Sequence, residues 1–156
     1  MKDLEVRIVK LEPIRAARFH AFSSTPEHDA WAKMQAWAEP KGWLADVPRA
    51  RRIFGFNNPN PSPGSPNYGY EFWVTLEPGD QPEEGIQVIG FPGGTYAVTR
   101  CAECGPEGQG IPKAWQRLVA WAENSRHRHA RHQWLEEHIS GTSDADMVLD
   151  LYMPIA

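Results

Sequence analysis

The pattern of apolar and polar positions along the chain occurs twice. The stretch "WAKMQAWAE" at 31–39 corresponds to "WQRLVAWAE" at 115–123. In both, apolar residues recur at the 3.6-residue spacing of a helix that buries one face. A turn-rich stretch precedes each of them, "SSTPEHDA" in the first case and "CGPEGQGIPKA" in the second, as expected before a helix start. The sequence therefore predicts two equivalent helices.

Strand-like segments surround each predicted helix in the same order. The stretch "EVRIVKLEPIRAARFHAF" precedes the first helix and "IQVIGFPGGTYAVTRCAE" precedes the second, each with a Pro or Gly break near its middle. Two further strand-like runs follow each helix. Each half of the chain, about 4–77 and 86–155, is thus predicted to be strand, helix, strand, strand.

Two such halves predict a single domain over residues 1–156 with an α+β fold. We expect a tandem β-α-β-β (SHS2-like) repeat that forms a curved, mostly antiparallel sheet, with both helices on one face and a ligand cleft on the other. The Pro-, Gly- and acid-rich segment 77–85 is the predicted connector. The segment 57–67, "NNPNPSPGSPN", has too many prolines for a strand and predicts a rigid loop.

The closing strands of the two halves each place an acid beside a large aromatic residue. Alignment of "YEFW" with "LDLY" puts Asp150 at the position of Glu71 and Tyr152 at that of Trp73. Strand geometry sends each acid and its aromatic partner to one face and the apolar residues between them to the helices. A buried carboxylate needs a partner, a change of protonation state or water. Acids solvated on an exposed sheet face are one interpretation, but matched positions in both halves favour a pocket.

The strand "QWLEEHI" of the second half contributes a further acid. If Leu135 and Ile139 pack on the helix, Glu136 and His138 lie on the opposite face, together with the acids of the closing strands. A bulge or a shift by one residue would place Glu137 there instead. The sequence favours Glu136 and keeps Glu137 as the alternative.

Composition narrows the class of protein. The chain has 156 residues, 41% of them apolar and 23% charged, with a net charge of −4, so one soluble domain needs neither a metal nor a disulfide to fold. The basic segment 126–132, "RHRHARH", is interpreted as a solvated loop, and no nucleic-acid surface is expected. The first twenty residues lack the apolar core of a signal peptide, and no run reaches transmembrane length. We therefore expect a cytoplasmic protein without membrane contact.

Cys101 and Cys104 form a lone CxxC motif. A zinc site needs four ligands and a redox pair usually opens a helix after a strand, and nearby histidines would suit either. Because there is no second CxxC, both cysteines are interpreted as structural or incidental. No metal and no cofactor are predicted.

Several motifs carry a family resemblance. The stretches "FGFNNPNP", "PGGTYAV" with the following "GPEG", "WLEEHI" and "LDLYMPI" together resemble a stand-alone GyrI-like small-molecule-binding domain, the effector-binding module also fused to AraC-type and MerR-type regulators. The resemblance covers about residues 4–155. It implies a central pocket whose acidic anchor is Glu136, or Glu137 after a shift, with the acid and aromatic residue of the closing strand at Asp150 and Tyr152. His138 stands where the family commonly has tyrosine, so the ligand cannot be carried over.

The residue pattern and the resemblance together predict a site in which aromatic walls and carboxylates bind an organic cation. Because strand-like sequence begins by residue 5, no helix-turn-helix is expected to precede the domain and no direct nucleic-acid binding is expected. The predicted ligand-binding residues are Phe54, Phe56, Glu71, Trp73, Tyr96, Trp115, Trp134, Glu136, Glu137, His138, Asp150 and Tyr152.

The leading functional hypothesis is a domain that binds, senses or sequesters a hydrophobic, aromatic or cationic small molecule, for example in protection against drugs or toxins. The first alternative is a hydrolase that opens strained-ring, cyclopropanoid genotoxic compounds, with Glu136 as the catalytic carboxylate and Glu137 as its rival. The second is an inhibitory protein partner of DNA gyrase. Exposed sheet edges also leave a homodimer open.

Overall fold

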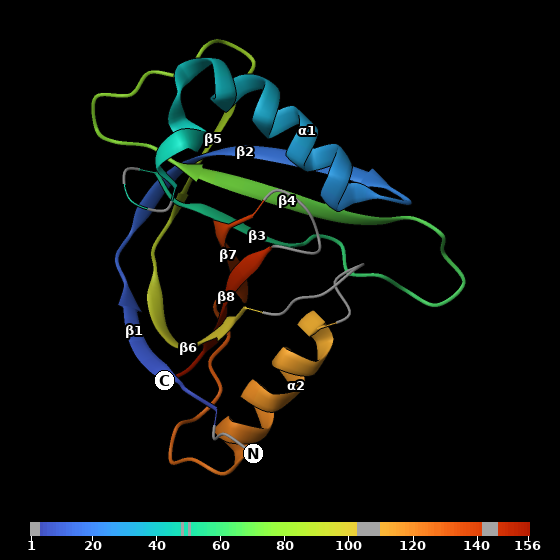
Figure 1. Cartoon of the computed structure of the whole chain (residues 1–156), viewed down its shortest axis with the longest axis vertical. Helices are drawn as coiled ribbons and strands as arrows, with labels where there is room; N and C mark the ends of the chain where they lie inside the picture. The colour runs from blue at the N-terminus through green and yellow to red at the C-terminus, as the bar shows by residue number, and fades with distance from the viewer. Residues whose placement is uncertain (1–3, 48, 50, 103–109, 142–146) are drawn as a thin grey trace. The chain divides into compact units, whose positions relative to one another are not determined.

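The structure, a computed structural model, describes residues 4–47, 49, 51–102, 110–141 and 147–156. The chain divides into two compact units: residues 1–13 and 92–156 form unit 1, and residues 14–91 form unit 2. The predicted α+β class is confirmed, because the described residues of each unit form one α-helix and four antiparallel strands. The elements in order (Figure 1) are β1 (Arg7–Leu11), β2 (Ile14–Ser23), α1 (Pro26–Ala38), the 3-10 helices η1 (Glu39–Lys41) and η2 (Trp43–Asp46), β3 (Ile53–Asn57), β4 (Tyr68–Thr75), β5 (Gln87–Phe91), β6 (Gly94–Cys101), α2 (Gly110–Glu123), β7 (Leu135–Ser140) and β8 (Val148–Pro154).

Unit 2 is built around α1, which packs on β2 and β4 (Figure 1). Its strands lie in the order β3-β4-β2-β5. The helix begins at Pro26, whose fixed φ suits a first helical position, and Glu27 and Asp29 place negative charge in the first turn. Met34 and Ala38 on its inner face are fully buried against the strands. This apolar stripe is the one that the helical periodicity of the sequence predicts.

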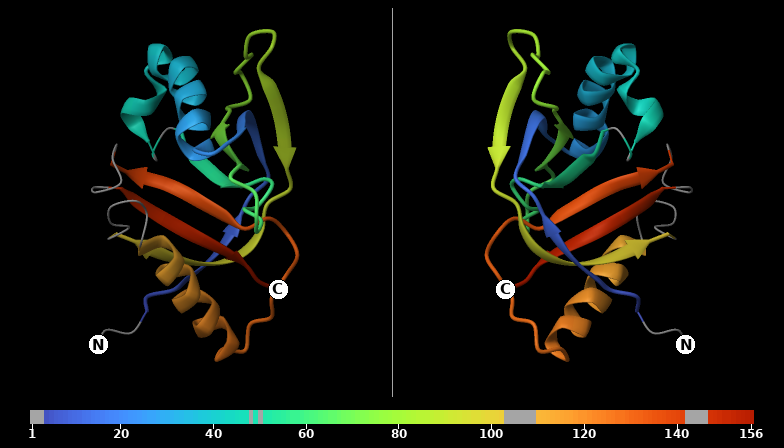
Figure 2. Two further views of the ribbon diagram at one scale, coloured as in Figure 1. Left: turned by 90° about the vertical axis from the view of Figure 1, so that its right-hand side faces the viewer. Right: turned by 90° about the vertical axis from the view of Figure 1, so that its left-hand side faces the viewer.

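Unit 1 repeats this arrangement around α2, which packs on β6 and β8. Both views of Figure 2 show this helix next to the two strands. The strand order is β1-β6-β8-β7. Leu118 and Ala122 of α2 form a core with Leu149, Leu151 and Met153 of β8. The predicted apolar faces of both closing strands are confirmed, since Phe72 and Val74 of β4 likewise pack beneath α1.

The opening strand of each sequence half pairs outside its own half. β1 precedes α1 in the chain but pairs with β6, and β5 precedes α2 but pairs with β2. The two breaks seen in the sequence, at Pro13 and at Pro92 with Gly93, separate β1 from β2 and β5 from β6. Gly93 has a φ of 81°, and a Cβ there would lie 2.0 Å from the carbonyl oxygen of Leu11. Only glycine fits this close approach of two chain segments.

The long loops also follow the sequence pattern. The proline-rich segment between β3 and β4 and the connector between β4 and β5 contain no strand or helix among the described residues. In the part of the chain that the structure describes, no helix is long and apolar enough to cross a membrane.

Candidate functional site

Each unit has one strand face that contacts its helix and an opposite face, here called the helix-distal face. On the helix-distal face of unit 2, Glu71 is buried, with 2% of its surface exposed. Arg18 of β2 donates to both of its oxygens, from Nε to Oε2 and from Nη2 to Oε1, each over 2.9 Å. Asn58 Nδ2 donates to Oε1 over 3.0 Å and Trp73 Nε1 donates to Oε2 over 2.7 Å. These donors match the roughly four lone-pair positions that a carboxylate offers.

The loop that carries Asn58 reaches Glu71 because of a glycine in β4. Gly69 accepts a hydrogen bond from the amide of Asn58 over 3.0 Å and donates one to the carbonyl of Pro59 over 2.9 Å. A Cβ at Gly69 would lie 1.9 Å from the carbonyl oxygen of Asn58. A larger residue would therefore push the loop, and with it the Asn58 side chain, away from the carboxylate.

The hydrogen bonds decide the charge of Glu71. Burial on its own raises the pKa of this carboxyl, but hydrogen bonds from Arg18, Asn58 and Trp73 and the positive charge of Arg18 outweigh burial and lower the pKa below its usual value. The acid in a hydrophobic strand is thus an ionised group with partners built into the same unit. The predicted contact of Glu71 with a ligand stays a prediction.

Aromatic rings surround this ion pair. The ring centroids of Trp73 lie 4.9 Å from those of Phe56 and 5.3 Å from those of Phe91. Phe54 is directly opposite Trp73 across β3 and β4 and is fully buried. The structure therefore brings together the predicted Phe54, Phe56, Glu71 and Trp73 on one face and adds Phe91 from the edge strand β5.

In unit 1 the register of β7 is the reverse of the one that the sequence favours. Glu136 lies opposite Leu151 of the helix-packed core, and its Oε2 accepts a hydrogen bond of 3.1 Å from the indole of Trp115 on α2. Glu137 lies opposite Asp150 on the helix-distal face. The placement of Glu136 away from the helix is wrong, and the placement of Glu137 there is the correct alternative. His138 lies on the same, helix-packed face as Glu136, because it is opposite Leu149.

Two carboxylates thus face each other across β7 and β8. Glu137 and Asp150 are each 3% exposed. The Tyr152 hydroxyl donates to Glu137 Oε1 over 2.6 Å. Like charges directly opposite each other destabilise a strand pair, so the positive charge that lies beside them matters for the stability of unit 1.

Two arginines supply this positive charge. Arg100 donates from Nε to Asp150 Oδ1 over 2.9 Å and from Nη2 to Oδ2 over 3.2 Å, and Arg7 donates from Nη2 to Oδ2 over 2.8 Å. The hydrogen bond with Asp150, helped by the negative charges of Asp150 and Glu137, raises the pKa of Arg100. Both arginine side chains remain more than half exposed, at 58% for Arg7 and 54% for Arg100.

Tyr96 supplies a buried ring on the same face. Its centroid lies 5.4 Å from that of Tyr152 and 4.7 Å from that of His132, both close to edge-on. Burial raises the pKa of Tyr96, and its hydroxyl donates to the carbonyl of Gln133 over 2.6 Å. The helix-distal face of unit 1 therefore combines an acid pair, an arginine pair and two tyrosine rings.

The other predicted residues of unit 1 lie on the side of α2. Trp115 and Trp134 are in contact, with ring centroids 5.4 Å apart, and Trp134 is among the exposed large apolar side chains. The predicted site thus divides between faces, with Tyr96, Glu137, Asp150 and Tyr152 on one and Trp115, Trp134, Glu136 and His138 on the helix side.

The cysteine motif and metal binding can be followed only in part. Cys101 is buried at the end of β6, whereas Cys104 and the "GPEG" motif lie outside the described residues. Within residues 4–47, 49, 51–102, 110–141 and 147–156, no group of three or more His, Cys, Asp or Glu side chains is arranged to hold a metal ion.

Comparison with known proteins agrees with this architecture. Residues 7–155 match the family of integron-associated effector-binding proteins. The chain belongs to this family. The predicted GyrI-like domain is confirmed by this match together with its structural neighbours. No curated protein sequence matches this effector-binding protein.

Solved structures with the same fold show how widely it occurs. A hydrolase from Listeria innocua is 9% identical, with coverage of 100% of this chain and 94% of that chain and a TM-score of 0.68. The C-terminal domain of EcmrR is 12% identical, with coverage of 98% of each chain and a TM-score of 0.68. The protein SAV2435 bound to tetraphenylphosphonium is 14% identical, with coverage of 98% and 94% and a TM-score of 0.59.

Sequence reasoning missed the basic side of the site in this effector-binding protein. Arg18 of β2 and Arg100 of β6 donate hydrogen bonds to the acids of the adjacent closing strands. Arg7 comes from β1, the strand that pairs outside its own sequence half. Arg18 and Arg100 stood in the sequence as charged residues within strand-like runs, just as Glu71 did. That shared anomaly was the available signal, but only strand pairing shows which arginine meets which acid.

Proposed function

We propose that this effector-binding protein binds a hydrophobic aromatic cation on the helix-distal face of unit 1, with Glu137 as its anchor. The observation that carries the proposal is the buried Glu137 carboxylate, hydrogen-bonded by Tyr152 beside the ring of Tyr96. An aromatic cation gains charge pairing from the carboxylate and cation–π attraction from the rings. Charge pairing is strengthened where water is excluded.

Glu137 suits this role better than the other two buried acids. Glu71 already accepts four hydrogen bonds within unit 2. Asp150 holds two arginines in ion pairs. The contacts of Glu137 include the hydrogen bond from the neutral Tyr152 hydroxyl, whose ring lies beside that of Tyr96. Glu137 also faces the like charge of Asp150 across the strand pair, so an added positive charge at this point relieves their repulsion.

Two further points support a hydrophobic cation as the ligand. The structural neighbour SAV2435 is bound to tetraphenylphosphonium, which combines four phenyl rings with one positive charge. In this chain, the arginines that balance Asp150 are more than half exposed, so solvent weakens their repulsion of a bound cation. Because Glu137 is buried, the incoming ligand replaces the side chains that cover it.

Titration with tetraphenylphosphonium, followed by tryptophan fluorescence and calorimetry, tests the proposal. We expect saturable binding to the wild-type protein and an affinity lower by about tenfold to a hundredfold for Glu137→Gln, as for a lost charge-assisted contact of about 1.5–3 kcal/mol. Glu136→Gln is the matched control on the same strand and should bind as the wild type does. Equal affinity of the wild type and Glu137→Gln would refute the role of Glu137, provided that both variants unfold at similar temperatures.

A hydrolase is the second candidate, because a structural neighbour from Listeria innocua is described as a hydrolase. In this second candidate function the buried Glu137 carboxylate, rather than Glu136, directs water onto a strained-ring electrophile. Mass spectrometry of a cyclopropane-bearing alkylating compound incubated with the protein separates the two functions. A hydrated, ring-opened product that forms with the wild type and not with Glu137→Gln would establish the enzyme. Unchanged compound would leave ligand binding alone.

A further inference from the structure

The C-terminal end of α1 in unit 2 holds a second group of aromatic and charged side chains. Trp37 of α1 and Trp43 of η2 are perpendicular, with ring centroids 5.0 Å apart and an interplanar angle of 89°. Gly42, with a φ of 76°, makes the turn that brings Trp43 back beside the helix. The two indoles thus form a corner on the surface of unit 2.

The ammonium group of Lys41 lies at this corner. Its Nζ is 5.0 Å from the ring centroid of Trp37 and 5.8 Å from that of Trp43. Both distances are within the range of cation–π attraction. The Lys41 side chain is 28% exposed, so the ammonium is partly withdrawn from water.

Glu83 completes the group. Its Oε1 accepts a hydrogen bond of 2.5 Å from Lys41 Nζ and its Oε2 accepts one of 2.6 Å from Trp37 Nε1. These two bonds lower the pKa of Glu83 to about 2, so the carboxylate stays ionised at neutral pH. A cation at the corner is therefore held by two rings and one carboxylate.

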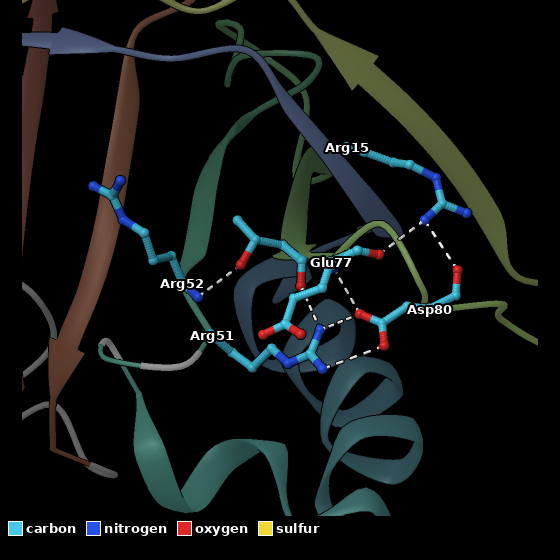
Figure 3. Close-up of polar contacts among 6 residues, drawn as sticks. Arg15, Arg51, Arg52, Glu77 and Asp80 are labelled. Carbon is cyan, nitrogen blue, oxygen red and sulfur yellow. Dashed lines mark hydrogen bonds and ion pairs between the residues drawn. The ribbon is translucent and has the colours of Figure 1, made fainter.

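A network of polar contacts holds an arginine against Trp43. The guanidinium carbon of Arg51 lies 3.6 Å from the ring centroid of Trp43. Figure 3 shows Arg51 bound to both carboxylate oxygens of Asp80, which also accepts the amide of Glu77 over 2.7 Å. Arg51 Nη1 further donates to the carbonyl of Thr75 over 3.3 Å. The hydrogen bond from Arg51 lowers the pKa of Asp80, so a fixed negative charge balances this arginine.

We propose that Trp37, Trp43 and Glu83 form a site for small alkylammonium cations, and that Lys41 occupies it as an internal ligand. The carboxylate of Asp80 balances the charge of Arg51. Glu83 therefore supplies the negative charge that pairs with a cation in the corner. The lysine ammonium is compact and strongly hydrated. A quaternary ammonium ion loses less hydration on entering an aromatic corner and competes for the same place. The site lies within unit 2 and is independent of Glu137.

Removal of the internal ligand gives the decisive test. Tetramethylammonium is titrated into the full chain, and the indole N–H signals are followed by two-dimensional NMR, with Trp37→Phe and Trp43→Phe used for assignment. We expect weak binding to the wild type and at least tenfold tighter binding to Lys41→Ala. Lys41→Arg keeps a cation in place and should bind no better than the wild type.

Two controls keep the result specific. Lys33→Ala removes another α1 lysine, whose ammonium donates to the carbonyl of His20, and should leave the affinity for tetramethylammonium unchanged. Glu83→Gln in the Lys41→Ala background should abolish the gain. Equal affinities of Lys41→Ala and the wild type, or shifts confined to other indoles, would overturn the proposal. If Lys41→Ala fails to fold, Lys41→Gln serves as the neutral variant. Glu137→Gln should not alter tetramethylammonium binding, so this test stands apart from that of the effector site.

Discussion

The two units of the molecule place an acid at the same point of the closing strand but give it different neighbours. In unit 2, Glu71 lies opposite Phe56, whereas in unit 1 Asp150 lies opposite Glu137. The aromatic residue two positions after each acid also has a different hydrogen-bond partner in the two units. Trp73 donates its indole N–H to Glu71, while Tyr152 donates its hydroxyl to Glu137. One unit holds a closed ion pair, and the other carries an additional buried carboxylate.

This difference separates the structural acid from the candidate ligand-binding acid. Arg18 is 24% exposed and is fixed on both oxygens of Glu71, whereas Arg7 and Arg100 share Asp150 and are mostly in solvent. Both units pair the acid of the closing strand with an arginine of the neighbouring strand, but Arg18 lies opposite Trp73 whereas Arg100 lies opposite Asp150 itself. A second acid arises where the opposite strand has Glu instead of Phe. The proposed effector site therefore belongs to unit 1, and the Glu71 ion pair of unit 2 is expected to stabilise the fold.

The largest expected effect comes from removal of the arginine of the closed ion pair. Arg18→Ala leaves Glu71 buried with its charge uncompensated, and we expect the free energy of unfolding in urea to fall by about 3–5 kcal/mol. Arg100→Ala leaves Arg7 on Asp150 and removes a mostly exposed group, so a loss of about 1 kcal/mol or less is expected. Equal losses would contradict the distinction between the two units.

Removal of the polar group from each aromatic partner sharpens the comparison. Trp73→Phe deletes a donor to a buried carboxylate and should lower the free energy of unfolding by about 1–3 kcal/mol without any change in the affinity for tetraphenylphosphonium. Tyr152→Phe deletes the donor to Glu137 and should change that affinity severalfold. Calorimetric titration and urea unfolding of both variants provide the measurements. A change in ligand affinity with Trp73→Phe alone would transfer the site to unit 2.

The smallest expected effect is the contribution of Glu71 to the loss of stability at acid pH. Because its folded-state pKa is lowered, the ionised Glu71 stabilises the fold fully above its unfolded value of about 4.3, and this contribution is lost as the pH falls through the folded-state pKa. Urea unfolding between pH 6 and pH 2 should therefore show a drop in stability below about pH 4.3. The drop should be smaller in Glu71→Gln. An equal drop in both proteins would show that Glu71 is not a source of the acid sensitivity.

The periodicity of the chain was sufficient to predict several parts of the structure. Trp31 and Trp115 opened repeats that proved to be equivalent helices, because a one-sided apolar stripe has one favourable arrangement on a sheet. The inward faces of β4 and β8 followed from alternation for the same reason. Proline density likewise marked the loop between β3 and β4.

The register of β7 could not be predicted from hydrophobicity. Leu135 is fully buried although it lies on the helix-distal face, opposite Tyr152. Both faces of this strand are packed, so an apolar residue does not reveal which face meets the helix. Which of Glu136 and Glu137 lies on the helix-distal face therefore depended on the pairing of β7 with β8.

The sequence by itself determined which segments become helix and strand, that the pattern is duplicated, and that Glu71 and Asp150 are equivalent. These features rest on local periodicity, which each segment carries in its own residues. Only the tertiary structure decided that β1 and β5 pair outside their own sequence halves, that Arg18 pairs with Glu71, and that Glu137 lies opposite Asp150. Each of these depends on strands that are distant in the chain but adjacent in the sheet, and adjacency is set by the packing of the whole unit.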